Sequence, residues 1–266
     1  MEMDEPLQFY KEKKCPACGK ISPGNFCMHC GEKLEHGRVT FLQFLKSFPE
    51  IILHVGFNIF YTIYELISHP GQMVKGYFAG NRKKHYKPIN FFLFIGGMVA
   101  VLFISNHISP PDSKMYEEWL DDKELGQALD KINTEYLTGI LMLQFPIVAL
   151  CTWLFFRKRE HYFGEHLVAN AYFIGEVALI RIIFFPIYYF NNKTDVVDTL
   201  DGIYVILTIV YYIYAFYDWL YNKKTWKGFF ITTIFVVLVY IFVMFITVLA
   251  LIPLLYLFKE AMAAIF

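Results

Sequence analysis

The chain has 266 residues, of which 56% are hydrophobic and 19% aromatic, and its formal net charge at pH 7 is +0. Soluble domains are about 45–50% apolar, and here the excess lies in long uncharged stretches, which excludes one soluble core and indicates membrane-spanning helices. Because the balanced charge provides no basic field, we expect no nucleic acid partner.

Four of the five cysteines form two Cys-x-x-Cys pairs near the N-terminus, each followed by glycine: Cys15, Cys18, Cys27 and Cys30. Each pair places two thiolates at a tight turn, and the glycine permits the positive φ that such a turn needs. Four thiolates make the closed tetrahedral site of a structural zinc ion, whose binding would supply the folding energy of so small a segment. The spacing predicts a cytosolic zinc ribbon over residues 1–36, with a redox dithiol as the alternative.

Residues 37–88 are expected to form an interfacial amphipathic helix and a basic juxtamembrane segment. Polar residues recur at steps of three or four, which places them on one helical face: His54, Asn58, Thr62, Glu65 and His69. A sixth span here would put the ribbon and the basic segment on opposite sides of the membrane. We therefore expect residues 50–68 to lie along the inner interface, apolar face down, with the polar face either solvated or forming a ligand or metal groove.

Five apolar stretches are long enough to cross a bilayer of roughly 30 Å. They are 89–108, 137–156, 166–190, 202–221 and 229–258. The expected fold is an all-α integral membrane bundle of about five transmembrane helices over residues 89–266, with an acidic external loop at 109–136.

Basic residues gather before the first of these spans, after the second and after the fourth: Lys75, Arg82, Lys83, Lys84 and Lys87; Arg157, Lys158 and Arg159; Lys223, Lys224 and Lys227. Because lysine and arginine flank spans on the cytosolic side, we expect a bacterial inner-membrane protein with its N-terminus in the cytosol and its C-terminus outside.

Charged and polar residues inside the spans form the first candidate site besides the cysteines. A charge at the bilayer centre costs at least about 2.5–3.5 kcal/mol and normally faces the bundle interior. We expect a polar intramembrane site, serving either as structural hydrogen bonding or as a pathway, made by Glu176, Arg181, Asn170, Tyr211, Tyr214 and Asp218.

Two further candidates lie at the cytosolic side. The basic segment can attract anionic lipid headgroups through Arg82, Lys83, Lys84, His85 and Lys87. At the mouth of the third span, His161, Glu165 and His166 suggest either a metal or general-base site or hydrogen bonding at a helix end. No H-E-x-x-H spacing is present, and we assign no catalytic residue.

Three short motifs follow one another before the first span: Pro70-Gly71, Tyr77-Phe78-Ala79-Gly80-Asn81-Arg82, and His85-Tyr86-Lys87-Pro88. The stretch from Gly56 to Phe94 that contains them resembles an uncharacterised bacterial family of zinc-ribbon membrane proteins, classed as a domain of unknown function. The resemblance implies the architecture and no activity.

The leading functional hypothesis is a non-enzymatic adaptor or regulator. Its ribbon and interfacial helix would engage a cytosolic or membrane protein partner, while the bundle contacts membrane lipids. The alternatives are a transporter or channel component using Glu176 and Arg181, and a lipid-modifying enzyme. The sequence has no Walker A loop, dinucleotide-binding glycine pattern or G-x-S-x-G elbow, which favours the non-enzymatic role.

Overall fold

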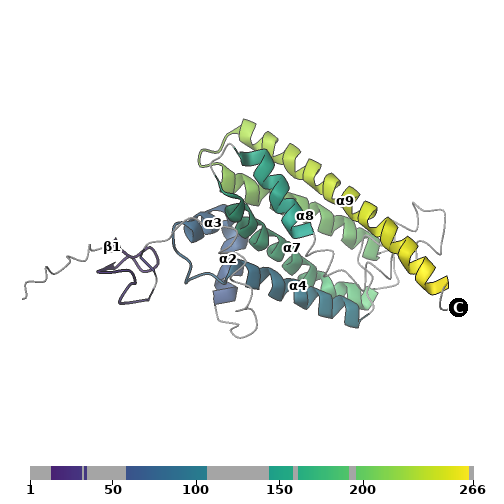
Figure 1. The fold of residues 1–266 in the computed structure, drawn as a ribbon, viewed down its shortest axis with the longest axis horizontal. Helices are drawn as coiled ribbons and strands as arrows, with labels where there is room; N and C mark the ends of the chain where they lie inside the picture. Colours follow the sequence, from purple (N-terminus) through teal and green to yellow (C-terminus); the bar gives the residue numbers. More distant parts are fainter. Residues whose placement is uncertain are drawn as a thin grey trace, which may run out of the picture.

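The computed structural model describes residues 13–31, 33–34, 58–106, 144–157, 161–191 and 196–263, which are mostly helical. Two short strands lie near the N-terminus, and helices follow: β1 (Lys13–Lys14), β2 (Ile21–Ser22), α2 (Asn58–Ser68), α3 (Pro70–Phe78), α4 (Pro88–Ser105), an unlabelled helix (Gln144–Phe156), α7 (Phe163–Asn191), α8 (Val196–Leu220) and α9 (Trp226–Ala263). In Figure 1 the longer helices run along the long axis, and the strands lie beyond one end, here called the ribbon end.

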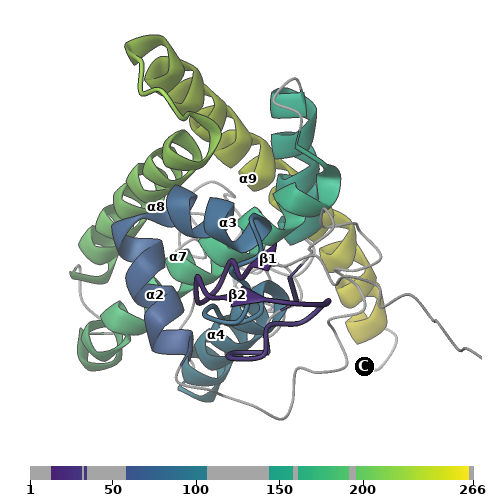
Figure 2. The ribbon, with the colours of Figure 1, turned by 90° about the vertical axis from the view of Figure 1, so that its left-hand side faces the viewer.

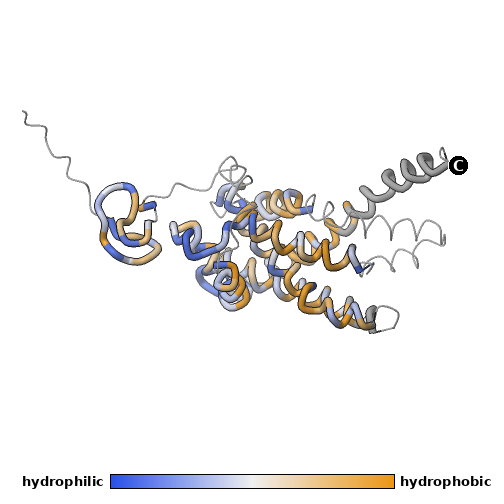
Figure 3. Tube along the Cα trace, turned by 90° about the horizontal axis from the view of Figure 1, so that it is seen from below, coloured by the Kyte–Doolittle hydropathy of each residue, from blue (hydrophilic) through white to orange (hydrophobic). Residues whose placement is uncertain are grey.

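Three helical segments within the described residues are long and apolar enough to cross a membrane: Phe163–Phe190, Gly202–Leu220 and Trp226–Val243. Two shorter apolar helical segments, Pro88–Phe103 and Gln144–Phe156, accompany them. Figure 3 shows the bundle as largely hydrophobic along its length, with hydrophilic residues concentrated toward the ribbon end. The expected loop at 109–136 and the start of the second expected span lie outside the described residues.

Helix α7 is the centre of the bundle. Its residues from Gly164 to Ala178 are all buried, and it contacts α2, α3, α4 and α8. A Cβ at Gly175 would lie 2.7 Å from the ring of Phe91, so α4 approaches α7 as closely as glycine allows. A helix that is apolar on every side is stable only when other helices surround it, which explains this central position.

Helices α2 and α3 cross the ribbon end of the bundle (Figure 2). The polar face of α2 is partly solvated, as one of the two sequence interpretations has it, and partly in contact with the protein: Asn58 and His69 are exposed, Glu65 is half-buried and Thr62 is buried. Asn58 donates through Nδ2 to the carbonyl of Lys83 at 2.9 Å, and Thr62 Oγ1 accepts the backbone N–H of Tyr86 at 2.8 Å. These two polar side chains thus fix the backbone of the loop between α3 and α4 against α2.

The opposite face of α2 is apolar and exposed. Phe60, Tyr64 and Ile67 are 70%, 66% and 58% exposed. Aromatic and aliphatic side chains on one face of a helix at the end of a membrane bundle are typical of an interfacial helix. The first part of the expected interfacial helix, residues 50–57, lies outside the described residues.

The start of α3 is capped by a residue of α8. The preceding residue, His69, makes no side-chain capping hydrogen bond. Instead, Asp218 Oδ2 accepts the backbone N–H groups of Gly71 at 3.0 Å and Gln72 at 3.2 Å. A carboxylate at this position satisfies two unpaired donors and interacts favourably with the positive end of the helix dipole.

Two lysines complete the environment of this carboxylate. Lys224 Nζ donates to Asp218 Oδ1 at 2.8 Å, and Lys75 Nζ donates to the backbone carbonyl of Asp218 at 2.8 Å. Asp218 is 4% exposed, so its charge is buried but fully compensated by backbone N–H groups and an ammonium. This cluster fixes α3 against the end of α8.

Gly71→Ala should destabilise the protein because a Cβ there would lie 2.2 Å from both the backbone carbon of Asp218 and the backbone nitrogen of Trp219. Backbone atoms cannot rotate away, so we expect a loss of about 2 kcal/mol or more. Gly76→Ala is the matched control, because nothing lies within 4 Å of its Cβ position in the same helix. It should be neutral or stabilising by up to about 1 kcal/mol. Thermal unfolding in detergent tests this, and equal melting temperatures for the two variants would contradict it.

Candidate functional site

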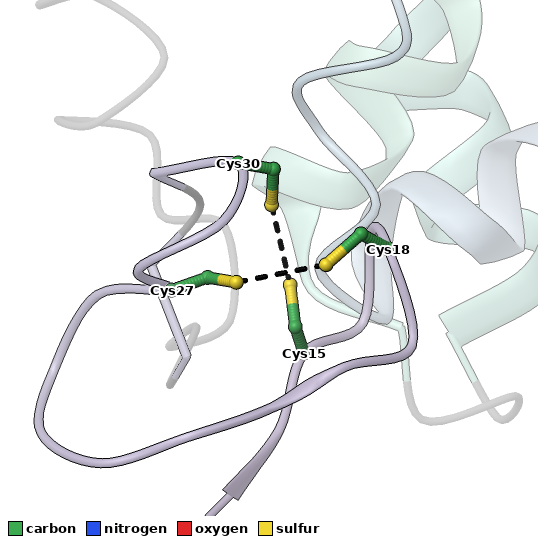
Figure 4. A group of neighbouring side chains, drawn as sticks. All are labelled: Cys15, Cys18, Cys27 and Cys30. Carbon is green, nitrogen blue, oxygen red and sulfur yellow. Dashed lines mark hydrogen bonds between the residues drawn. The ribbon is translucent and has the colours of Figure 1, made fainter.

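The four N-terminal cysteines converge on one point (Figure 4). Their Sγ atoms all lie within 4.8 Å of one another. The Sγ atoms of Cys15 and Cys30 are 3.5 Å apart, and those of Cys18 and Cys27 are 3.6 Å apart. A tetrahedral ion with metal–sulfur bonds of about 2.3 Å needs sulfurs about 3.8 Å apart. The donor set and its spacing fit a four-thiolate metal site, as the sequence predicts.

Two similar turns build this cluster. The N–H of Gly19 donates to the carbonyl of Cys15 at 2.9 Å, and the N–H of Gly31 donates to that of Cys27 at 2.8 Å. Both glycines have positive φ, 74° and 66°, which confirms the role expected of them. Strands β1 and β2 pair antiparallel across the first turn, with Lys13 opposite Ser22. Backbone hydrogen bonds thus hold the cysteines in place from both sides.

Ser22 polarises one of the thiols. Its Oγ donates to Cys27 Sγ at 3.6 Å and accepts the N–H of Met28 at 3.2 Å. The hydrogen bond from Ser22, followed by a backbone N–H of Cys30, lowers the pKa of the Cys27 thiol to about 5. The thiolate, which is the metal-binding form, is therefore favoured at neutral pH.

The ribbon contacts the helices through the basic segment. Lys83 Nζ donates to the carbonyl of Cys30, while Lys84 and Lys87 are exposed. His85 does not belong with them as an expected headgroup contact, because it is only 4% exposed. It lies with Nε2 3.6 Å from Glu65 Oε2, and burial lowers its pKa. His85 is therefore buried beside Glu65 of α2 and does not point outward with the lysines.

His161, Glu165 and His166 come together at the ribbon end, as expected. His161 Nδ1 lies 3.1 Å from Glu165 Oε2, and the two histidine ring centroids are 6.0 Å apart. Trp219 of α8 packs against both histidines, at 5.1 and 4.9 Å between ring centroids. Glu165 also accepts the N–H of Tyr162 at 3.2 Å, which is the hydrogen bonding of a helix start.

A second group of polar side chains continues this cluster into the bundle. His166 Nδ1 lies 3.1 Å from Thr152 Oγ1, and Asn170 Nδ2 donates to Thr152 Oγ1 at 3.0 Å and to the carbonyl of His166 at 2.8 Å. Sequence reasoning missed Thr152 and Trp219. Thr152 is a polar residue in an apolar run, but only the fold shows what it faces. Asn170 therefore belongs to this cluster and not to a site around Glu176.

Three other residues of the expected intramembrane site bind the corner between α2 and α3. Tyr211 donates to the carbonyl of Leu66 at 3.4 Å, and Tyr214 to that of Ser68 at 2.5 Å. Asp218 caps α3, as described above. These three side chains of α8 act on backbone groups at the ribbon end.

Glu176 and Arg181 lie deeper in the bundle. Glu176 is 2% exposed, and its Oε2 has no hydrogen-bond partner among the described residues. The guanidinium of Arg181 lies over the rings of Tyr204 and Phe103, at 4.7 and 5.7 Å from their centroids. Hydrogen bonds and cation–π contacts thus engage the six residues of the expected intramembrane site at several places along the bundle, and Tyr211 connects two of them, because it interacts electrostatically with Glu176 as well as donating to Leu66. Their action as one polar site stays a prediction.

Part of the chain is similar in sequence to a known family. Residues 58–99 match the model of a family described as protein of unknown function (DUF3667). This range covers α2, α3 and most of α4, and contains the Pro70-Gly71 and Tyr77–Arg82 motifs, so the resemblance found over Gly56–Phe94 is confirmed. No curated protein and no solved structure matches the chain.

Thr152→Val should destabilise the bundle, because it removes the hydroxyl that lies between His166 and Asn170 and leaves buried polar groups unpaired. We expect a loss of about 1–3 kcal/mol. Thr208→Val is the matched control in α8, because the buried Thr208 hydroxyl has no hydrogen-bond partner in the described part of the chain. It should be neutral or stabilising. Unfolding curves in detergent compare the two variants, and a larger loss for Thr208→Val would refute this account of the cluster.

Proposed function

We propose that this protein is a non-enzymatic inner-membrane adaptor whose ribbon binds a cytosolic partner protein. Three large apolar side chains on the ribbon support this proposal: Ile21, Phe26 and Met28 are 63%, 61% and 77% exposed. They flank the buried residues Ser22 and Cys27, which hydrogen bonds bring together with Met28. Apolar side chains that a small folded unit leaves exposed are typical of an interaction surface.

The proposed topology has five spans, formed by the three long apolar segments together with α4 and the Gln144–Phe156 helix. The ribbon end faces the cytosol of a bacterial cell in this arrangement. It is supported by the basic residues of the loop before α4 and of the loop between α8 and α9, which lie at that end. Helix α9 begins at the ribbon end and runs to the opposite end, which agrees with an external C-terminus (Figure 1).

The alternatives receive less support. A transport pathway needs polar groups that can exchange partners, whereas Asp218 and Tyr214 bind backbone groups at helix ends and Arg181 contacts aromatic rings. An enzyme needs a reactive pair that is free to act, whereas Glu165 is engaged in the hydrogen bonding of a helix start. This engagement of Glu165 favours a structural role for the His161, Glu165 and His166 cluster.

Zinc is the metal that we propose for the cysteine cluster, because tetrahedral thiolate sites select zinc or iron over hard cations, and small closed ribbons are typically zinc sites. Elemental analysis of the purified protein should give about one zinc per chain. Cys18→Ser should abolish zinc binding, whereas Cys151→Ser should retain it, because Cys151 lies in the bundle and outside the cluster. Finding iron, or zinc that survives Cys18→Ser, would contradict the assignment.

A photo-reactive amino acid at position 26 tests the adaptor proposal in cells. We expect a cross-linked protein adduct of defined mass when it replaces Phe26, and none when it replaces Lys20, another exposed residue of the ribbon. The adduct should disappear when Cys18→Ser is added, because the apolar surface depends on the folded ribbon. Adducts with lipid alone, or the same proteins captured from both positions, would overturn the proposal.

A further inference from the structure

A cavity of about 640 Å³ lies at the ribbon end, between α3, the start of α7, and the loop that joins α8 to α9. Its polar lining comes from residues far apart in the sequence, including Lys75, His161, Lys223, Thr225 and Lys227. Leu220 and Ile231 add an apolar side. The residues expected to contact headgroups, Arg82, Lys83, Lys84, His85 and Lys87, are not among its lining.

The lining is positively charged, although Lys75 and His161 interact with Asp218 and Glu165 behind it. No carboxylate is among the lining residues, three of which are lysines. Lys224, which lies between two of the lining residues, is paired with Asp218 at 2.8 Å. By contrast, no described carboxylate lies within ion-pair distance of Lys223 or Lys227, and both are exposed. A cavity with this lining favours an anion.

The start of a helix adds to the positive field at the cavity. Helix α9 begins at Trp226, between the lining residues Thr225 and Lys227, and a helix N-terminus favours negative charge. Trp219 also lines the cavity, but it is 1% exposed and protein atoms cover its indole nitrogen, so its ring is part of the apolar wall.

The surroundings of the cavity are those of a membrane boundary. Trp226 and Phe230, in the first turns of α9, are 80% and 60% exposed. Tryptophan is enriched where the bilayer core meets the headgroups, so the lysines of the cavity are at the depth of lipid phosphates. The apolar side made by Leu220 and Ile231 suits the start of an acyl chain.

We propose that this cavity binds a phosphate group, supplied by the headgroup of an anionic phospholipid. Lys223 and Lys227 attract the anion, and Lys75 and His161 also line the cavity. The site is independent of the protein partner proposed for the ribbon. A free phosphate ion has the same chemistry, and the experiment distinguishes the two sources.

Calorimetric titration of the full-length protein in detergent tests the site with three probes: dihexanoyl phosphatidic acid, dihexanoyl phosphatidylcholine and inorganic phosphate. Lys223→Gln with Lys227→Gln should weaken phosphatidic acid binding about tenfold or more. Lys14→Gln with Lys20→Gln removes the same charge from exposed residues of the ribbon that do not line the cavity, and should change it by less than about twofold. All four lysines are exposed, so both double variants should fold.

Binding of phosphatidic acid without binding of inorganic phosphate identifies the lipid as the source. Equal binding of inorganic phosphate supports the anion site and assigns it to the free ion. The proposal is overturned if the wild-type protein binds neither, if it binds phosphatidylcholine equally, or if the two double variants lose affinity alike.

Discussion

The corner between α2 and α3 depends on one face of α8. A helix end leaves backbone carbonyls unpaired, and a helix start leaves N–H groups unpaired, so a sharp corner between two helices presents both. The hydroxyls of Tyr211 and Tyr214 donate to carbonyls at the end of α2, and the Asp218 carboxylate accepts N–H groups at the start of α3. Steps of three and four residues place these side chains on one face of α8, in the order that the corner requires.

This corner positions everything else at the ribbon end. With α2 fixed, its polar face binds the loop between α3 and α4, and Tyr172 of α7 adds a hydrogen bond of 2.6 Å from its hydroxyl to the carbonyl of Tyr86. The same loop carries Lys83, which donates to the ribbon at Cys30. On the other side, α3 presents Lys75 to the cavity. The hydrogen bonds of α8 thus underlie the attachment of the ribbon and one wall of the candidate anion site.

A contact can be predicted from the sequence when its two residues lie close together in the chain, and much less easily when they lie far apart. The cysteine cluster is predictable because two pairs and two glycines determine its turns locally. The polar stripe on α2 is equally visible, but the sequence does not show that Asn58 and Thr62 bind the loop after α3. The stripe on α8 is visible too, yet Asp218 acts on Gly71, which no local pattern connects to it. In the sequence His85 is one more basic residue of its segment, and only the structure places it beside Glu65.

The same contacts are relevant to whether the bundle forms a transport pathway or anchors the ribbon to the membrane. A side chain in a transport pathway has to exchange partners as its substrate passes. Asp218 cannot leave the N–H groups of Gly71 and Gln72 without exposing the start of α3, and Tyr214 cannot leave the carbonyl of Ser68 without exposing the end of α2. Arg181 is likewise held between two aromatic rings. These polar groups are engaged at helix ends and in packing contacts, which favours the proposed adaptor over a transport pathway.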